Sequence, residues 1–196
     1  MPATARSTKN GYHHGDLRAA LIATAMGMLE RGEPFSLRAV ARQAGVSASA
    51  PYRHFAEREE LESALAAEGL RDLKTDLTRD RGLPTTVHEL AEFGVAYVEF
   101  ALRRPALFRL MFGNECDTGN DERVRAAADV HQLLASAVTS VFPDSDPADL
   151  ALAGWGLVHG LACLYLDRKL TADSFDQVAA RVRACFTAVF ATTPGH

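Results

Sequence analysis

The sequence predicts an all-α protein. Apolar residues recur every three or four positions along most of the 196-residue chain, which is the spacing of one face of a helix. No alternation of apolar and polar residues, which would indicate a half-buried strand, persists in any segment. Capping residues, glycines and prolines separate the periodic segments. Together these observations predict about nine helices and no sheet.

Three of the helices are expected before residue 82. The first follows Asp16 and is closed by Gly32, and its apolar face consists of Leu17, Leu21, Ala25 and Met28. The second is capped by Ser36, whose hydroxyl can accept a hydrogen bond from the first turn, and it ends at Gly45. The third covers about 57–81 and stops at the Gly-Leu-Pro sequence that follows it.

Five further helices are expected after residue 85. Thr86 and Glu89 form a capping-box pattern at the start of the first of them, and Ser174 and Gln177 form one at the start of the last. Pro147 suits a first helical position. The five helices cover about 86–104, 106–112, 121–142, 147–167 and 174–192, and the polar stretch 113–120 is a loop.

The stretch from Gly45 to Phe55, GVSASAPYRHF, supplies the ninth helix. Two short helices of about eight residues, joined by a Gly-Val-Ser connection, have the spacing of a helix-turn-helix. Gly45 can adopt the positive φ that ends the first helix, and Ser47 or Ser49 can cap the second. Pro51 is tolerated in the first turn, where backbone N–H groups have no intrahelical partner. Phe55 is expected to turn back into the core.

Side chains on this second short helix have the chemistry of DNA contacts. Its start can approach another surface closely because three small residues stand there: Ala48, Ser49 and Ala50. Tyr52 and His54 can donate hydrogen bonds to phosphate oxygens. Arg53 has the bidentate donor group that reads guanine in a major groove.

At these residues the chain resembles the tetracycline-repressor (TetR) family of bacterial transcription regulators. The similarity covers residues 35–61, FSLRAVARQAGVSASAPYRHFAEREEL, a long and specific motif that makes up about a seventh of the chain. Residues 104–112 are also similar to the family. The pattern Trp155-x-x-x-His159-Gly160 resembles a subgroup with a Trp-His-Gly signature in its C-terminal domain, and so does Tyr12-His-His-Gly-Asp-Leu17.

The resemblance implies a role for each matching position. The positions that contact phosphate in the family match Ser36, Tyr52, His54 and Arg58. Those that face base edges match Arg38, Ala48, Ser49, Ala50 and Arg53. The family often has glycine or a larger polar residue where this chain has Ala48 and Ser49. Direct readout is therefore expected to depend mainly on Arg38 and Arg53.

The resemblance also implies the domain organisation and the assembly. Residues 1–14 would be an N-terminal arm, 15–61 a DNA-binding domain with its helix-turn-helix at 36–55, and 62–196 a ligand-binding and dimerisation domain. Members of the family are homodimers on double-stranded DNA, so two recognition helices would enter major grooves about 34–36 Å apart on a pseudo-palindromic site. The last two predicted helices suit the dimer interface, because one carries a broad apolar stripe and the other is rich in glycine.

Charge and cysteine content fit a cytoplasmic protein with a polyanionic partner. Residues 1–60 contain eight Lys or Arg against six Asp or Glu, whereas the rest of the chain contains thirteen against nineteen. The odd number of cysteines and the absence of CxxC spacing argue against a disulfide framework or a zinc site. The N-terminus lacks the apolar segment of a signal peptide. No cofactor is expected.

One segment, residues 150–166, is apolar enough to need comparison with a membrane span. It contains Gly156 and Gly160 at the spacing of a helix-pairing face in a bilayer. It falls just short of the ~18–20 residues that a span requires, and His159 within it would be costly there. A buried interface helix in water, not a membrane span, is therefore expected.

Aromatic and methionine side chains of the C-terminal part have two interpretations. Most of them can simply fill the core, or several can line a ligand cavity between helices. The candidates for ligand contact are Phe93, Tyr97, Phe100, Phe108, Met111, Trp155 and His159. Trp155 and His159, one helical turn apart, are the first choice, but the same two positions suit the dimer interface equally well.

Enzymatic and metal-binding interpretations find little support in the sequence. The chain has no GxSxG, P-loop or HExxH motif. His159 and Cys163 lie one turn apart without a third group to orient them. His13 and His14 have no third metal ligand at a suitable spacing, so they fit either an arm that contacts DNA or a disordered tail.

The sequence therefore predicts a ligand-responsive, sequence-specific DNA-binding regulator, a repressor, that acts as a homodimer with a small-molecule effector. By the resemblance, effector binding would move the helix at 57–81 and separate the two DNA-reading parts. The alternative is an all-α module that binds or sequesters a small molecule without reading DNA. A third hypothesis, an all-α enzyme, would require turnover that depends on His159 or Cys163.

Overall fold

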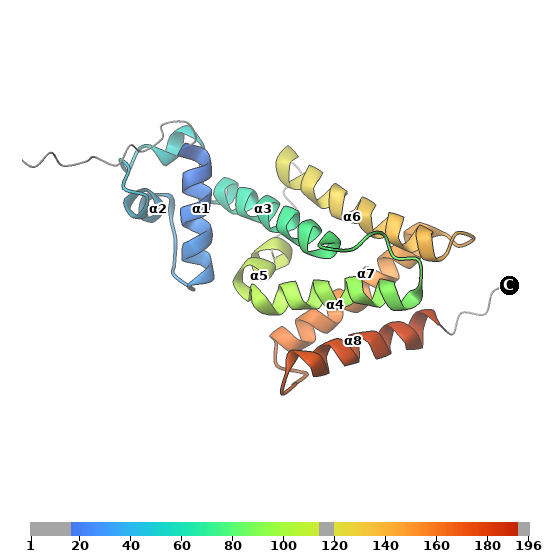
Figure 1. The fold of residues 1–196 in the computed structure, drawn as a ribbon. Coiled ribbons are helices and arrows are strands. Elements are labelled where there is room, and N and C mark those ends of the chain that lie inside the picture. The colour runs from blue at the N-terminus through green and yellow to red at the C-terminus, as the bar shows by residue number, and fades with distance from the viewer. Residues whose placement is uncertain (1–16, 114–119, 192–196) are drawn as a thin grey trace, which may run out of the picture.

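The computed structural model describes residues 17–113 and 120–191, and all regular structure in these ranges is helical (Figure 1). The predicted fold class is confirmed. Eight α-helices and one 3-10 turn follow in the order α1 (Leu17–Glu30), α2 (Leu37–Gln43), η1 (Pro51–Arg53), α3 (Arg58–Thr78), α4 (Val87–Arg103), α5 (Pro105–Gly113), α6 (Asp121–Val141), α7 (Pro147–Leu166) and α8 (Phe175–Phe190).

Most predicted helix ends are confirmed by their capping geometry. The Ser36 hydroxyl accepts a hydrogen bond from the Ala39 N–H at 3.2 Å, and the Thr86 hydroxyl accepts one from the Glu89 N–H at 3.1 Å. Gly32 and Gly45 have φ values of +68° and +70°. Glycine adopts positive φ without a steric penalty because it has no Cβ atom. Both glycines therefore end their helices by backbone geometry.

Two predicted helices are shorter than expected. The second helix of the helix-turn-helix is reduced to a turn followed by η1, because Pro51 has no N–H to complete an α-helical bond to the Ser47 carbonyl. That carbonyl instead accepts from the Ala50 N–H at 3.0 Å, which is 3-10 geometry. The long helix expected over 57–81 ends at Thr78, since Arg79 is extended and Asp80 has a φ of +56°.

The N-terminal part of the molecule, here called the head, consists of α1, α2, η1 and the first two turns of α3. Its apolar core includes Leu21, Val40, Phe55, Leu61 and Leu65, all at most 1% exposed. Phe55 turns inward as predicted. The remaining helices form the body, whose core is a separate apolar cluster.

A single helix, α3, connects the head to the body (Figure 1). Leu65 packs in the core of the head, whereas Ala66 and the apolar residues after it pack in the core of the body. The helix runs without interruption across this change. The backbone hydrogen bonds of α3 therefore run continuously from the body into the head.

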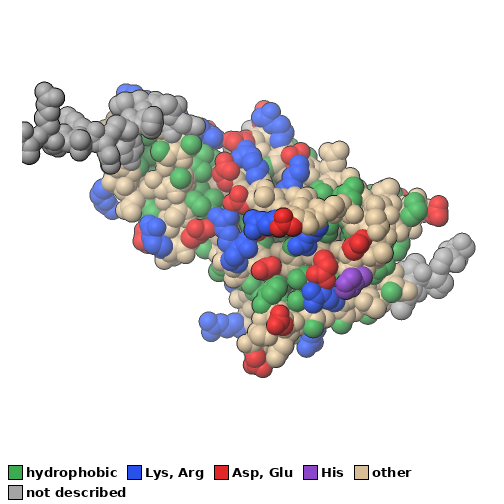
Figure 2. All heavy atoms as spheres, in the orientation of Figure 1, with side chains coloured by type: hydrophobic (Ala, Val, Ile, Leu, Met, Phe, Trp, Pro, Cys, Tyr) green, Lys and Arg blue, Asp and Glu red, His purple; other side chains and the backbone are tan. Residues whose placement is uncertain are grey.

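Ion pairs also tie the head to the body. The Arg104 guanidinium, at the junction of α4 and α5, donates to Glu30 of α1 and to Asp72 of α3, each at 2.6 Å. Figure 2 shows acidic and basic side chains intermingled where the head meets the body. The orientation of the head is thus fixed by polar contacts on several helices as well as by α3.

Helix α4 lies at the centre of the body and packs against α3, α7 and α8. Gly94 permits close contact with two of these helices, because a Cβ atom there would lie 2.5 Å from the Phe186 ring of α8 and 3.0 Å from Val158 of α7. The crossing of three helices at this point requires a residue without a side chain.

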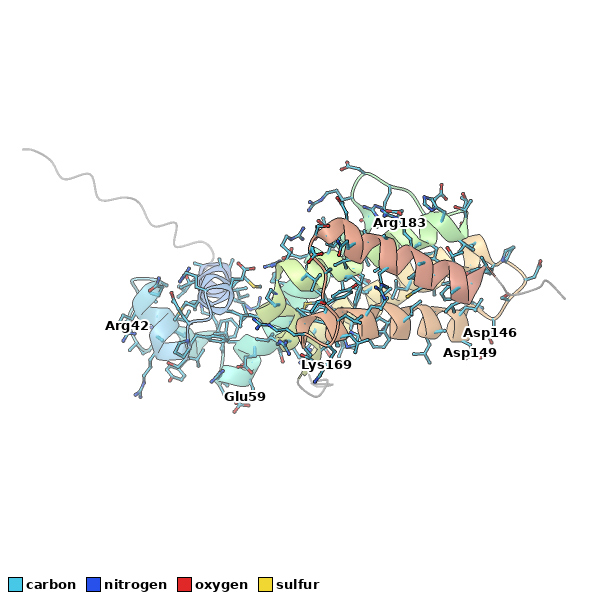
Figure 3. The ribbon with its side chains drawn as sticks, turned by 90° about the horizontal axis from the view of Figure 1, so that it is seen from below. Arg42, Glu59, Asp146, Asp149, Lys169 and Arg183 are labelled. Atoms are coloured by element: carbon cyan, nitrogen blue, oxygen red, sulfur yellow. The ribbon has the colours of Figure 1, made fainter. Side chains whose placement is uncertain are left out.

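The outer faces of α7 and α8 remain apolar and uncovered. Helix α7 is long and apolar enough to cross a membrane, yet only 17% of its most apolar 18-residue window is buried. Leu152 and Leu164 on α7 and Val189 on α8 are 62%, 42% and 48% exposed. In the view of Figure 3 both helices run along the body, with Asp146 and Asp149 at the end of α7 that is remote from the head.

Candidate functional site

The first candidate site is the outer surface of the head around α2 and η1. Gly45 reverses the chain after α2, and the residues from Ser47 to Phe55 form successive turns, closed by bonds such as His54 N–H to the Pro51 carbonyl at 2.9 Å. Pro51 lies in the first turn of η1, as predicted. Neither Ser47 nor Ser49 caps this turn; their hydroxyls lie 3.3 Å from each other instead.

Two arginines on this surface have the exposure and freedom that base contacts need. Arg38 of α2 and Arg53 of η1 are exposed, and within 17–113 and 120–191 neither pairs with a carboxylate. Arg42, also on α2, points away from the molecule at the far end of the head (Figure 3). The outer surface of α2 and η1 therefore presents positive charge that no acidic residue in the described ranges neutralises.

The other residues predicted to face base edges differ in exposure. Ala48 and Ser49 are exposed. Ala50 is only 8% exposed, and its N–H and carbonyl both take part in the turns around it. Its side chain packs inside the head, so Ala50 shapes the turn and does not present a surface to a ligand.

The residues predicted to contact phosphate lie on the same surface. Tyr52 is 49% exposed, and His54 is half-buried beside it. The Ser36 hydroxyl accepts the capping hydrogen bond, which leaves its proton available to donate. Arg58 bonds Glu62 at 2.7 Å and lies over the Phe35 ring, so part of its donor capacity is already used within the protein.

The second candidate site is in the body, where a cavity of about 210 Å³ lies between α3, α4, α5, α6 and α7. We call it the α6 cavity, because α6 forms one side of it along three turns. Its wall includes Leu70, Tyr97, Met111, Arg123, Val130 and Trp155. The lining is mostly apolar with a few polar groups, as in many small-molecule sites.

The predicted ligand residues divide between several places. Tyr97, Met111 and Trp155 meet at the α6 cavity, whereas Phe93 borders a smaller cavity of about 30 Å³ that Tyr97 and Trp155 also line. Phe108 and His159 line a third cavity, of about 250 Å³, beside Cys163. Phe100 lines none of these three cavities; it is 1% exposed in the core, with the Arg104 guanidinium 5.8 Å from its ring centre.

Three of these residues form a polar cluster around the buried Tyr97 hydroxyl, with Trp155 and His159 partly buried. The Trp155 indole N–H donates to the Tyr97 hydroxyl at 3.2 Å, and this hydroxyl lies 2.9 Å from Nδ1 of His159. Because the hydroxyl accepts from the indole, it can donate its own proton to Nδ1, which places the imidazole proton on Nε2. Trp155 and His159 therefore direct polar atoms toward Tyr97, inside the protomer.

Burial also sets the protonation of this region. It lowers the pKa of His159, which favours the neutral ring that the hydrogen bond to Tyr97 requires. It raises the pKa of the Tyr97 hydroxyl and of the Cys163 thiol. Cys163 is accordingly a protonated thiol near neutral pH, which is a poor nucleophile.

Sequence reasoning missed seven of the ten residues that line the α6 cavity, among them Phe112, Arg123 and His131. Arg123 was detectable, because it occupies the apolar face of α6 one turn before Ala126 and Ala127 and two turns before Val130. A cation on the buried stripe of a helix is unusual enough to mark a site. Within the described ranges no group of three His, Cys, Asp or Glu could hold a metal ion, and His13 and His14 lie outside those ranges.

Comparison with known proteins gives one family match and several similar structures. Residues 90–190, just over half of the chain, match the family described as "Tetracyclin repressor-like, C-terminal domain". A protein of unknown function from Rhodococcus sp. RHA1 is 32% identical, with a TM-score of 0.77 over 91% of this chain and 97% of its own. No curated protein sequence matches the chain.

Two further structures are similar in fold. A candidate TetR-family transcriptional regulator from Rhodococcus sp. is 19% identical, with a TM-score of 0.65 over 87% of this chain and 96% of its own. A candidate fatty acid metabolism regulator from Clostridium perfringens is 16% identical, with a TM-score of 0.62 over 85% of this chain and 96% of its own.

Proposed function

Because the chain belongs to the tetracycline-repressor family of transcription regulators, we propose that it is a sequence-specific DNA-binding repressor released by a small-molecule effector. The observation that carries this proposal is the pair of exposed arginines, Arg38 and Arg53, without carboxylate partners in the described ranges. They stand on either side of the turn at Gly45, where the sequence resembles the DNA-reading motif of the family.

In this proposal the head is the DNA-binding part of the chain. Arg38, Ala48, Ser49 and Arg53 would face base edges, and Ser36, Tyr52, His54 and Arg58 would contact phosphates. Ala50 is not retained, because its side chain is buried. A bidentate arginine discriminates guanine from other bases by about 1–3 kcal/mol, so Arg38 and Arg53 would supply most of the direct readout.

We further propose that two copies associate through α7 and α8. Gly156 and Gly160 lie on α7 with no atom within 4 Å of the place where a Cβ would stand, so a second helix could approach closely there. Leu152, Leu164 and Val189 are the large apolar side chains exposed on these helices. A second copy would cover this face and place two heads for successive major grooves of a pseudo-palindrome.

The body would bind the effector, and residues 1–14 would form an arm beside the DNA-binding part 15–61. We also propose that the chain belongs to the Trp-His-Gly subgroup of the family, because Trp155, His159 and Gly160 match its signature. We propose that the protein regulates without catalysing a reaction. In support, the raised pKa of the Cys163 thiol keeps it protonated and so a poor nucleophile. Such a protein would act in the cytoplasm, where the chromosome of a bacterium lies.

The test is selection from a fragmented genomic library at two salt concentrations with the full-length protein. A repressor should retain one pseudo-palindromic sequence at the higher salt, because base contacts survive when phosphate attraction is screened. Binding that fades with salt and selects no sequence would reject specific readout. The small-molecule binding module without DNA readout would then replace the repressor as the function.

Assembly is tested separately by sedimentation of the purified protein. A dimer should form in the wild type and be lost in Leu152→Glu, which places a charge on the proposed interface. Glu99→Gln, on the exposed side of α4, serves as a control. A wild-type monomer, or a Leu152→Glu dimer of unchanged strength, would rule out this interface.

A further inference from the structure

The α6 cavity contains one side chain that is always charged, Arg123. Its volume is about 210 Å³, well above what a single water molecule needs. None of the lining residues in the described part of the chain is acidic. The cavity therefore combines an apolar wall with an excess of positive charge.

Arg123 is buried to an unusual degree for a cation. Its exposure is 6%, and a buried charge is costly unless it is paired and hydrogen-bonded. One guanidinium nitrogen, Nη2, donates to the Met111 carbonyl at 3.0 Å, in the last turn of α5. Across the ranges that the structure describes, no carboxylate lies within ion-pair distance of Arg123.

The hydrogen bond to Met111 fixes the guanidinium without using its full capacity. The terminal carbonyls of a helix lack intrahelical partners, and the helix end is favourable for a cation. A guanidinium has five N–H donors, of which the Met111 carbonyl uses one. Arg123 is thus held in place at the cavity wall, with donors that no acceptor in 17–113 or 120–191 is shown to use.

The lining of the cavity changes character along α6. Arg123 stands in its first turn, and Ala127, Val130 and Leu134 follow on the same side. The distance along the axis from residue 123 to residue 134 is about 16 Å. One end of this wall is cationic and the rest is apolar, apart from the exposed His131, which packs edge-on against Trp155 at the outer edge.

We propose that the α6 cavity binds a small molecule with one carboxylate and an apolar body, and that Arg123 binds the carboxylate. The planar fork of a guanidinium matches the two oxygens of a carboxylate. A single cation balances a single negative charge, whereas a phosphate monoester would bring a second. This inference rests on the proposed function, because the molecule would be the effector.

Trp155 provides a direct signal for the test. It is the only tryptophan in the chain and it lines the cavity, so its fluorescence reports occupancy there. The full-length protein is titrated with octanoate and with 4-phenylbutyrate, and separately with the primary amide of each. The amides have nearly the shape of the acids but no charge, so their comparison isolates the carboxylate.

The wild type should bind each acid about ten to a hundred times more tightly than its amide, the range expected for a charged hydrogen bond. In Arg123→Gln this preference should disappear while the affinity for the amides stays the same. Arg123→Lys keeps the charge without the fork and should retain a reduced preference. Arg125→Gln is the matched control, since Arg125 is exposed on the same helix and bonds only a backbone carbonyl in the described structure.

The inference is overturned if wild-type protein binds acids no better than amides, or if folded Arg123→Gln keeps the preference. In the first case Arg123 serves only to cap α5. If Arg123→Gln does not fold, Arg123→Lys provides the test. A preference of this variant for acids over amides that equals the wild-type preference overturns the role of the guanidinium fork. Selection from the genomic library with the same protein tests the proposed DNA binding separately. If the protein selects a DNA sequence but binds acids no better than amides, only the carboxylate inference is rejected. If it prefers acids but selects no DNA sequence, only the repressor function is rejected.

Discussion

Arg18 of α1 and Glu122 of α6 form an ion pair at 2.6 Å between the head and the body, across 104 residues of sequence. The second oxygen of the same carboxylate accepts from Arg71 of α3 at 2.5 Å. Glu122 thus joins three helices, and the next residue along α6, Arg123, lines the cavity. A ligand that displaced the start of α6 would act on α1 through this carboxylate.

Glu122→Gln should therefore loosen the head more than the body. The pairs with Arg18 and Arg71 are partly exposed, so a total loss of about 0.5–1 kcal/mol in the free energy of unfolding is expected. Hydrogen–deuterium exchange should accelerate in α1 and stay unchanged in α8. Asp129→Asn, which removes only the exposed pair with Lys74, is the control. Equal acceleration in both helices would contradict a role at the junction.

Arg53→Ala should weaken specific DNA binding more than non-specific binding. Loss of a bidentate base contact costs about 1–3 kcal/mol on the selected operator, whereas a phosphate contact costs the same on every sequence. The measurement is fluorescence anisotropy with the selected DNA and with a scrambled duplex. Lys169→Ala, in the body just after the end of α7 (Figure 3), removes the same charge outside the head. Equal losses on both duplexes would make Arg53 a phosphate contact.

Tyr97→Phe should destabilise the body, although it removes a single oxygen atom. The Trp155 indole N–H and His159 Nδ1 would lose their shared partner, at a cost of about 1 kcal/mol because both groups are only partly buried. Urea unfolding gives the free energy, and Trp155 fluorescence reports the changed environment. Tyr165→Phe removes a hydroxyl from α7 that has no hydrogen bond in the described part, and it should be nearly neutral.

Gly94→Ala should be destabilising by about 1–3 kcal/mol, because overpacking a helix crossing outweighs the better helix propensity of alanine. The added methyl group would lie 2.5 Å from the Phe186 ring. The same change at Gly27 in α1 meets only the flexible end of Arg31, 3.2 Å away, and should be neutral or stabilising. Thermal unfolding of the two variants compares them, and equal midpoints would refute the close contact.

Acidification should weaken the contact between α4 and α8. Hydrogen bonds from Arg183, at 2.6 Å and 3.1 Å, hold the pKa of Glu92 below its ordinary value of 4.5. A carboxylate with a lowered folded-state pKa stabilises the protein above its unfolded pKa, and this stabilisation is lost as pH falls through the folded value. Urea unfolding between about pH 5 and pH 3 should show a flatter pH dependence in Glu92→Gln than in wild type. Equal pH dependence in wild type and Glu92→Gln would contradict the role of this ion pair.

The sequence predicted the helices well because their signals are local. Ser36, Thr86 and Gly45 act on backbone atoms within a few residues of themselves, so their effects can be read from spacing alone. The shortening at Pro51 was also a local effect, but the helix-turn-helix spacing and the family motif both favoured a full helix there. The missing N–H decided between α and 3-10 bonding.

The cavity could not be predicted, because it depends on where five helices leave space. Tyr97, Met111 and Trp155 were selected for their size and polarity, and they do meet there. Phe100 has the same character but faces the core, and only the packing of α4 distinguishes it from Tyr97. Arg123 broke the apolar pattern of α6, which is the one sequence signal that could have drawn attention to the cationic end of the cavity.

The uninterrupted course of α3 gives the molecule a lever. Its 21 residues span about 31 Å, with one end in the body and the other carrying the head. A tilt of roughly 6° about the body end would displace the other end by about 3 Å, which is the rise of two residues along an α-helix. Two such levers in a symmetric pair would double the change in the span between heads. A movement of a few ångströms at the cavity wall would thus change the distance between the two heads, so that they no longer match the spacing of successive major grooves.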